Sequence, residues 1–538
     1  MATQLRTKRW LRFGAISLGT SLLQSLLLAL PGVSGERVYI NYGLLERYVS
    51  VESLETYAYT GELPPELEYY RRYFTPEQLE QFRMGLLVSA DLDVVAVSQF
   101  LYTPQGEAIL DWLGDIVQTA GRQNGARSIR AAVILAAANT DEGGLNLLNV
   151  LKAFPTQGVR LDLQRFSGVA DAVVGELNQT QQATRLIQEQ AAAAVAESGS
   201  DRSISSQIQL AAAGPYSWSR QVLGQAPLPT DLYLPAGQNA PLVVISHGLG
   251  GDRTTLAYLA EHLASHGFAV AVVEHPGSNA NQLNALLVGQ AEEAVEAVDL
   301  VNRPVAIQAL LDELEAMAQR DAAFRSRIDF NRIGVLGQSL GGYTSLALAG
   351  ATVDRDTLLE ICPPQIDQLN LSLLLQCSVL LAPEPLPTLQ DDRIQAAIAI
   401  NPLNSQIFGP QGLGNITVPI MLVSGTADTV TPALAEQIRP FTWLQSVERY
   451  LMLWEGGTHF SAIYNAQAGA EAIPLPEAVI GPDPEVAQRY LRIMGLAFFQ
   501  THLAGDDSYR QYLDPAFANA LSQSDLPLSL VQELMLAE

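Results

Sequence analysis

The sequence contains few lysine, cysteine and histidine residues. Its 538 residues include two lysines, Lys8 and Lys152, together with two cysteines and six histidines. So few lysines argue against Schiff-base chemistry and against a serine–lysine pair as the reactive group. Two cysteines without nearby histidines cannot complete the four-ligand shell of a zinc site. We therefore expect no metal and no cofactor.

Basic residues are also scarce relative to acidic ones. The chain has 31 Lys and Arg residues against 56 Asp and Glu, which gives a formal net charge of -25 at pH 7. Four of the basic residues and none of the acidic ones lie within the first 35 positions, so the remainder carries -29. A surface this acidic repels nucleic acid and anionic bilayers, and we expect neither as a partner.

The first 35 residues have the layout of a signal peptide. Arg6, Lys8, Arg9 and Arg12 precede an apolar segment, 13–30, which is followed by a Pro-Gly-Val-Ser-Gly stretch. We expect cleavage after residue 35, export to the periplasm or the extracellular space, and no membrane span in the mature chain. An uncleaved anchor is the alternative, but the glycines and serines within the segment make it a weak span.

A chain of this length is too long for a single core, so two or three domains are expected. Apolar residues at helical spacing from Leu44 to Ala153 predict an all-α domain over 36–165. A Thr-Pro-Glu-Gln motif at Thr75 is typical of a helix start, and Thr103-Pro104 indicates another. A helical connector and a polar linker follow over 166–210.

The remaining residues, 211–538, predict an α/β domain. Short strand-like segments at 217–223 and 231–234 open it. From Pro241 onward, apolar strand patterns alternate with helical ones, which favours a mostly parallel sheet flanked by helices.

A Gly-Gln-Ser-Leu-Gly turn at 337–341 directly follows the apolar run 333–336. A buried strand that enters such a turn and then a helix is typical of the nucleophile elbow of the α/β-hydrolase fold. The glycines are needed because a side chain at either position would collide with the neighbouring strand or helix. The motif therefore predicts an α/β-hydrolase fold with Ser339 as the nucleophile.

A serine nucleophile needs a histidine to accept its proton and a carboxylate to orient that histidine. In this fold they follow the serine in the order acid, then histidine. His459 lies in a glycine-rich loop after an apolar strand and is the predicted base, whereas His502 lies in an amphipathic stretch typical of a surface helix. Asp428 follows the apolar segment 420–425 and is the predicted acid, in preference to a role as a helix cap only.

The negative charge that develops on the substrate carbonyl needs two backbone N–H donors, an oxyanion hole. We expect one from Leu340, directly after the nucleophile. The other is expected from Leu249, in the His-Gly-Leu-Gly-Gly loop that follows the apolar strand 242–245. We interpret His247 as a residue that shapes this loop.

The segment from about Pro241 to Phe460 resembles the platelet-activating-factor acetylhydrolase branch of α/β-hydrolases, which is also similar to dienelactone hydrolases. The resemblance rests on three motifs: Ser-His-Gly-Leu-Gly-Gly at 246–251, Leu-Ala-Ser-His-Gly-Phe at 263–268, and Glu-His-Pro-Gly-Ser at 274–278. It implies Ser339 as nucleophile and His459 as base.

The chain departs from that family at one position. The animal enzymes carry their acid after the strand matched here by 396–400, where this sequence has Asn401-Pro402. An asparagine cannot stabilise the imidazolium as a carboxylate does, so the resemblance implies that the acid has moved to Asp428.

The amino-terminal part resembles an uncharacterised helical domain found ahead of predicted secreted hydrolases in photosynthetic bacteria. The resemblance rests on four short motifs, at 42–43, 75–78, 100–104 and 154–157. It implies an architecture and no activity.

Cys362 and Cys377 lie in a Leu/Pro-rich segment, 352–387, that interrupts the alternation of helices and strands. In an oxidising compartment we expect a disulfide between them, worth about 3 kcal/mol for a loop of this size. Insertions at this point of the fold commonly cap the active site. We therefore expect a cap that offers an apolar wall to an acyl group.

These features predict a secreted serine esterase or lipase that cleaves carboxylic esters, including short-acyl phospholipids, through an acyl-enzyme. A peptidase or polyester hydrolase with the same triad is an alternative, because the triad does not select the leaving group. A different class is a non-catalytic scaffold whose helical domain binds a partner in the cell envelope. The sequence leaves the oligomeric state open.

Overall fold

The computed structural model describes residues 35–42, 45–90, 92–198, 209–224, 226–362, 370–463, 480–482 and 484–536. The predicted signal peptide, except Gly35, and most of the predicted linker lie outside these residues. Two compact units are present: one comprises residues up to 101 with 109–167, and the other comprises 102–108 with the chain from 168 onward.

The second unit contains a nine-stranded sheet in the order β13-β12-β11-β10-β9-β7-β8-β6-β5. Six central strands, from β12 to β8, are parallel, and β13, β6 and β5 pair antiparallel at the two edges. Its strands are β5 (Trp218–Leu223), β6 (Thr230–Pro235), β7 (Ala240–Ser246), β8 (Ala269–Val273), β9 (Ile328–Gln338), β10 (Ile394–Ile400), β11 (Ile420–Gly425), β12 (Arg449–Trp454) and β13 (Leu528–Val531). The prediction of a mostly parallel sheet is confirmed.

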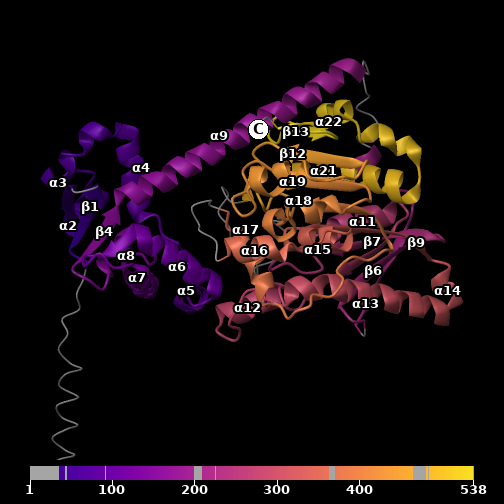
Figure 1. The fold of residues 1–538 in the computed structure, drawn as a ribbon, viewed down its shortest axis with the longest axis horizontal. Helices are drawn as coiled ribbons and strands as arrows, with labels where there is room; N and C mark the ends of the chain where they lie inside the picture. Colours follow the sequence, from indigo (N-terminus) through magenta and orange to yellow (C-terminus); the bar gives the residue numbers. More distant parts are fainter. Residues whose placement is uncertain are drawn as a thin grey trace, which may run out of the picture. The chain divides into compact units, whose positions relative to one another are not determined.

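Helices cover both faces of this sheet, with α13 on one side and α21 on the other (Figure 1). The helices that follow individual strands include α11 (Ala257–Ser265), α12 (Ala280–Leu287), α13 (Asp299–Arg320), α14 (Ala322–Arg325), α15 (Leu340–Leu348) and α18 (Ser405–Gly414). Nearer the carboxyl terminus lie η5 (Leu434–Ile438), α19 (Arg439–Phe441), α21 (Pro484–Phe499), η6 (Gln500–Ala504), η7 (Asp507–Tyr512) and α22 (Pro515–Leu521).

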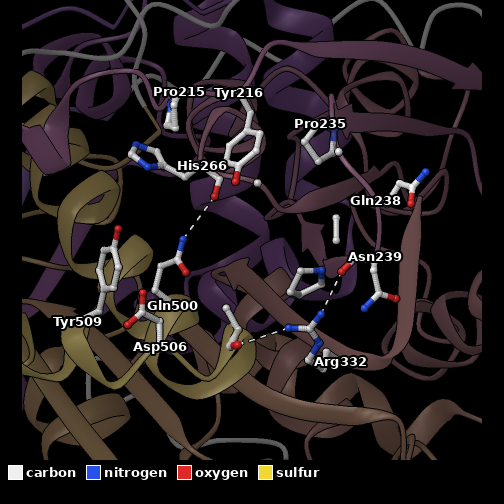
Figure 2. Close-up of a pocket in the computed structure, with 15 residues that line it drawn as sticks. Pro215, Tyr216, Pro235, Gln238, Asn239, His266, Arg332, Gln500, Asp506 and Tyr509 are labelled. Atoms are coloured by element: carbon white, nitrogen blue, oxygen red, sulfur yellow. Dashed lines mark hydrogen bonds between the residues drawn. The ribbon is translucent and has the colours of Figure 1, made fainter. Parts of the chain in front are cut away.

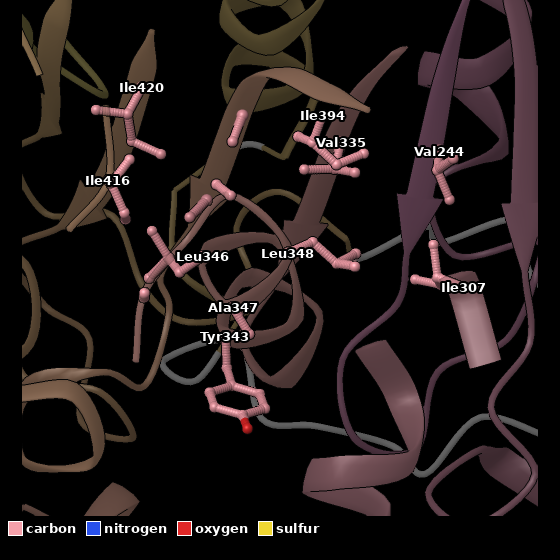
Figure 3. Close-up of a cluster of buried hydrophobic side chains, with 14 of the residues drawn as sticks. Val244, Ile307, Val335, Tyr343, Leu346, Ala347, Leu348, Ile394, Ile416 and Ile420 are labelled. Atoms are coloured by element: carbon pink, nitrogen blue, oxygen red, sulfur yellow. The ribbon is translucent and has the colours of Figure 1, made fainter. Parts of the chain in front are cut away.

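Alternate residues of the central strands enter two separate cores because successive side chains of a strand point to opposite faces. Val244 of β7 and Val335 of β9 pack with Ile307 of α13 and with α15 (Figure 3). Their strand neighbours Ile245 and Leu336 pack instead with α11 and α21. Burial on both faces explains why these strands are continuously apolar in the sequence.

The first unit differs from the predicted all-α domain because it contains a four-stranded sheet in the order β2-β1-β4-β3. The strands are β1 (Arg37–Tyr42), β2 (Leu45–Ser50), β3 (Val117–Thr119) and β4 (Gly158–Asp162). β1 pairs antiparallel with β2 and parallel with β4, which lies more than a hundred residues further along the chain. The helical expectation for this domain was therefore incomplete, since it missed short strands whose pairing is non-local.

Two helices of this region, α4 and α6, begin at the predicted starts. In α4, Thr75 Oγ1 accepts a hydrogen bond from the Gln78 N–H while the Gln78 side chain accepts one from the Thr75 N–H, which confirms the predicted helix start. The helices are α2 (Val51–Thr60), α3 (Pro65–Glu68), η1 (Arg71–Tyr73), α4 (Pro76–Leu87), α5 (Val94–Leu101), α6 (Pro104–Ile116), α7 (Ala126–Ala138), η2 (Thr140–Glu142) and α8 (Leu147–Lys152). A further helix, α9 (Leu163–Ser198), begins in this unit, and most of its residues belong to the second unit.

The predicted cap segment contains α16 (Arg355–Ile361), α17 (Ser372–Ser378) and η4 (Val379–Leu381), and a disulfide joins Cys362 to Cys377. The buried carboxylate of Glu436 in η5 accepts hydrogen bonds from Gln376 of α17 and from the Asn404 and Ser405 N–H groups. This carboxylate therefore joins α17 to the first turn of α18.

Within the described residues, no helix combines the length and the apolar character needed to cross a bilayer.

Candidate active site

Ser339 occupies the sharp turn between β9 and α15, at the carboxyl edge of the sheet. Its φ of 56° lies in the left-handed region, which is strained for a residue with a side chain. A hydrogen bond from the Ser339 N–H to the Ile400 carbonyl, 2.8 Å, holds the turn against β10. A Cβ at Gly337 would lie 2.1 Å from the Gly341 carbonyl oxygen, so the turn requires glycine there.

The three residues predicted as nucleophile, base and acid lie together. His459 Nε2 is 2.9 Å from Ser339 Oγ, and His459 Nδ1 is 2.7 Å from Asp428 Oδ2. Asp428 lies in the loop after β11 and His459 in the loop after β12, so the sheet brings the three loops to one edge. Each of the three residues is 5–6% exposed.

The Asp428 carboxylate is held by several further donors. Oδ1 accepts the N–H groups of Val430 and Thr431, each at 2.8 Å, and Oδ2 accepts the Thr431 hydroxyl at 2.8 Å. Burial by itself raises the pKa of Asp428, but the charge and hydrogen bond of His459 and the Thr431 bonds together hold that pKa below its ordinary value. Asp428 is therefore an oriented carboxylate that stays ionised at neutral pH.

Asn401 has a structural role that the sequence did not indicate. Its Nδ2 donates to Asp428 Oδ2 at 2.5 Å, so the amide lies against the same oxygen that faces His459. The residue has a φ of 43° and is 1% exposed. The departure noted at this position thus places a hydrogen-bond donor beside the carboxylate.

Gln338 is a second residue that sequence reasoning missed. Its Nε2 donates to the His459 carbonyl at 3.1 Å, which connects the residue before the nucleophile to the histidine loop. No motif marks this glutamine, because the second position of the Gly-x-Ser-x-Gly turn is variable by definition.

The loop predicted to supply an oxyanion donor lies directly against the nucleophile. A Cβ at Gly248 would be 3.1 Å from Ser339 Cβ, and one at Gly341 would be 2.0 Å from the Ser246 carbonyl oxygen. Leu340 is the first residue of α15, where N–H groups have no partner within the helix. Leu249 directly follows Gly248 in the same loop.

The remaining predicted residues lie elsewhere. His502, expected at a surface, is only partly exposed in η6 and its Nε2 is 3.1 Å from the Tyr450 hydroxyl. Over the part of the chain that the structure describes, no cluster of His, Cys, Asp and Glu has the arrangement of a metal site.

A cavity of about 430 Å³ lies at the opposite edge of the sheet from Ser339. It is lined by Ala240 and Pro241 at the start of β7 and by Arg332, Tyr216 and Tyr509 (Figure 2). The Arg332 guanidinium already donates to Asp329 and to the carbonyls of Asn239 and Ala504. The cavity is therefore separate from the Ser339 site, and its arginine is engaged in bonds within the protein.

Two family models match the chain. Residues 34–162 match a family described as an alpha/beta hydrolase of unknown function, and residues 221–303 match platelet-activating factor acetylhydrolase, isoform II. The first match covers the region with the four-stranded sheet, and the second covers the strands and loops from β5 to the start of α13.

Individual relatives include cutinases. The chain is 24% identical to cutinase 1 of Thermobifida cellulosilytica over 57% of this chain and 86% of the relative. It is 30% identical to cutinase est2 of Thermobifida alba over 24% of this chain and 38% of the relative. It is 29% identical to platelet-activating factor acetylhydrolase of Bos taurus over 22% of this chain and 34% of the relative.

The parallel sheet, the elbow at its carboxyl edge and these matches agree with one another. The chain has the α/β-hydrolase fold, and the relatives that it matches are named cutinases and platelet-activating factor acetylhydrolase.

Proposed function

We propose that this chain is an exported serine hydrolase that cleaves carboxylic esters through an acyl-enzyme on Ser339. The observation that carries the proposal is the position of His459, within hydrogen-bond distance of both Ser339 Oγ and the Asp428 carboxylate. A nucleophile, a base and a group that orients the base, connected in this way, are what acyl transfer requires.

In the first half of the reaction, Ser339 Oγ attacks the ester carbonyl carbon and its proton passes to His459 Nε2. The carbonyl oxygen becomes an oxyanion, which the N–H groups of Leu249 and Leu340 stabilise; each such donor lowers the barrier by roughly 3 kcal/mol. His459 then gives the proton to the alkoxide oxygen as the C–O bond breaks. An alcohol leaves and the acyl group stays on Ser339.

In the second half, water replaces the alcohol. His459 takes a proton from the water, the hydroxide attacks the acyl carbon, and the proton returns to Ser339 Oγ as the acid leaves. Asp428 keeps its charge throughout and stabilises the imidazolium. The hydrogen bonds from Val430, Thr431 and Asn401 favour this ionised form.

Two further parts of the proposal concern substrate and location. We propose esters with an apolar acyl group, including short-acyl phospholipids, because the relatives are named cutinases and acetylhydrolases. The disulfide between Cys362 and Cys377 favours an oxidising compartment, in support of export.

The test compares the mature protein with Ser339→Ala on p-nitrophenyl esters of graded acyl length. Ser508→Ala, which changes an exposed serine in η7, is the matched control. We expect turnover in the wild type and the control and none above background in Ser339→Ala. Equal turnover by Ser339→Ala would refute the proposal, and the length profile distinguishes an acetylhydrolase from a lipase.

A further inference from the structure

Arg303 is a fully buried cation that the proposed reaction does not use. It lies in the second turn of α13 with 0% of its surface exposed. Burying a guanidinium is costly unless each of its N–H groups finds an acceptor. Its acceptors therefore show what the residue holds in place.

The guanidinium connects α13 to the loop 246–251, the predicted source of one oxyanion donor, which is called the oxyanion loop below. Nη1 donates to the His247 carbonyl at 2.8 Å, and Nη2 donates to Ser278 Oγ at 2.7 Å. Nε donates to Asp299 Oδ2 at 3.0 Å, and the Ser278 hydroxyl donates to the same carboxylate oxygen. Burial lowers the pKa of Arg303 to about 10, so the cation persists at neutral pH.

Ser278 is bonded to the oxyanion loop as well as to Arg303. Its carbonyl accepts the Gly250 N–H at 2.8 Å. The loop is thus fixed at the His247 carbonyl, before Leu249, and at the Gly250 N–H, after it. The Leu249 N–H lies between these two anchors, and both anchors lead to Arg303.

Two neutral histidines, His247 and His275, form further hydrogen bonds beside the oxyanion loop. The His275 N–H donates to His247 Nε2 at 3.0 Å, and His275 Nε2 is 2.9 Å from Ser246 Oγ. Burial, followed by the charge of Arg303, lowers the pKa of His247 to about 3. His247 is therefore neutral and its Nε2 accepts, so Arg303 is the cation of this cluster.

A hydrogen bond joins α13 to α15, the helix that follows the predicted nucleophile. Pro304 lacks an N–H, so the Leu300 carbonyl has no donor from the next helical turn. The Tyr343 hydroxyl of α15 donates to this carbonyl at 3.0 Å. Arg303 is next to Pro304, so the residue that holds the loop is positioned by the helix that begins at Leu340.

We infer that Arg303 is a positioning residue that aligns the Leu249 N–H with the Leu340 N–H for the developing oxyanion. The inference rests on the proposed serine hydrolase function and assigns the support of one of its two donors. Oxyanion donors act only when they point at the place where charge develops, and a shift of about 1 Å at a reacting centre can lower the rate by about 100-fold.

The test uses Arg303→Met and the double variant Arg303→Met/Asp299→Asn. The double variant removes both buried charges together and so avoids an unpaired carboxylate, and we expect it to fold. Arg320→Met is the matched control, since Arg320 is an exposed arginine of the same helix whose partner is Glu313. Thermal unfolding and circular dichroism verify folding before the kinetics.

For Arg303→Met and the double variant, we expect kcat on p-nitrophenyl butyrate to fall by about 10- to 100-fold while KM stays within about threefold. The affinity for a trifluoromethyl ketone, which forms an oxyanion adduct with the nucleophile, falls by the same factor as kcat/KM. The affinity for butyrate, the acid product, is unchanged. The Arg320→Met control retains wild-type values.

A double variant with kcat within twofold of the wild type would overturn the inference. So would a fall in kcat with an unchanged trifluoromethyl ketone affinity, because that pattern indicates that both oxyanion donors are still in place and that the loss arises elsewhere. A wild type whose turnover does not depend on Ser339 would instead remove the proposed function itself, and the Ser339→Ala comparison detects this case separately.

Discussion

At the scale of single residues, Asp428 and Asn401 have complementary roles. The carboxylate faces His459 Nδ1 through Oδ2, and the amide of Asn401 donates to that same oxygen. In the proposed reaction, the amide keeps the carboxylate oriented and ionised, while only the carboxylate carries the charge that opposes the imidazolium. Substitutions at the two positions should therefore differ in size.

For Asp428→Asn we expect kcat to fall by about 10⁴-fold with little change in KM, because an amide favours the wrong histidine tautomer. Steady-state kinetics on a p-nitrophenyl ester measure this effect. A loss of less than tenfold in a folded variant would show that another residue serves as the acid.

For Asn401→Ala we expect a smaller loss, about 10-fold, because one charge-assisted hydrogen bond to Asp428 is removed while the carboxylate remains. Steady-state kinetics on a p-nitrophenyl ester measure this loss, and a kcat equal to that of the wild type would contradict this role.

Some residues of the candidate site can be predicted from the sequence and others cannot. Ser339, His459 and Asp428 were predicted because chain order and strand–loop context restrict the candidates strongly. The contact of Asn401 with Asp428 and the contact of Arg303 with the His247 carbonyl were not predicted. An asparagine after a strand and an arginine in a helix are ordinary surface features in a sequence, and their contacts are formed only when distant segments pack.

At the scale of elements, the turn from β9 to α15 depends on close approach of backbone segments. A Cβ at Gly337 would lie 2.1 Å from the Gly341 carbonyl oxygen, a distance that no side-chain rearrangement relieves. Gly175 in α9 has no heavy atom within 4 Å of the corresponding Cβ position. The two glycines provide a matched pair.

We expect Gly337→Ala to lower the free energy of unfolding by about 3 kcal/mol or more. Gly175→Ala should instead raise it by about 0.5–1 kcal/mol, because alanine is the better helix former. Denaturant unfolding measures both. A Gly337→Ala variant as stable as the wild type would contradict the packing described for the turn.

The cap segment is the second element with a testable role. Replacement of both Cys362 and Cys377 by serine removes a disulfide that closes a loop with a sequence separation of 15. We expect a loss of about 3 kcal/mol in stability, together with a changed acyl-length profile if the segment forms a wall of the acyl site. An unchanged profile and unchanged activity would refute the cap proposal, independently of the loss in stability.

The short strands of the first unit could not be predicted from the spacing of apolar residues. β1 and β4 are five or six residues long and pair across more than a hundred residues. Arg160 of β4 donates a hydrogen bond to the side chain of Asn41 in β1. A helical pattern in the sequence does not indicate such a contact between strands. The strands of the second unit were easier to predict because both faces are buried and their apolar runs are continuous.

At the scale of the whole molecule, five of the six histidines are held neutral. Burial lowers the pKa of His262 to about 3 and of His502 to about 4, and His247, His266 and His275 shift in the same direction. In the unfolded chain each titrates near about 6.5. Below that pH the unfolded state binds protons that the folded state does not, so stability falls as pH falls.

Each such histidine contributes up to about 1.4 kcal/mol per pH unit to this loss, until the pH reaches its folded pKa. His262 lies in α11, away from Ser339, and offers a direct check. We expect His262→Asn to reduce the pH dependence of the free energy of unfolding between about pH 6 and 4.5 by close to one proton. An equal slope in variant and wild type would contradict the burial of a neutral imidazole at this position.

Covalent labelling of the active site can show whether Ser339 is the nucleophile of an ester hydrolase. The mature protein is inhibited with a fluorophosphonate, and the modified residue is located by peptide mass spectrometry. We predict one adduct, on Ser339, with loss of ester turnover in proportion to labelling. Full turnover after labelling of Ser339, or inhibition with the adduct on another residue, would contradict it.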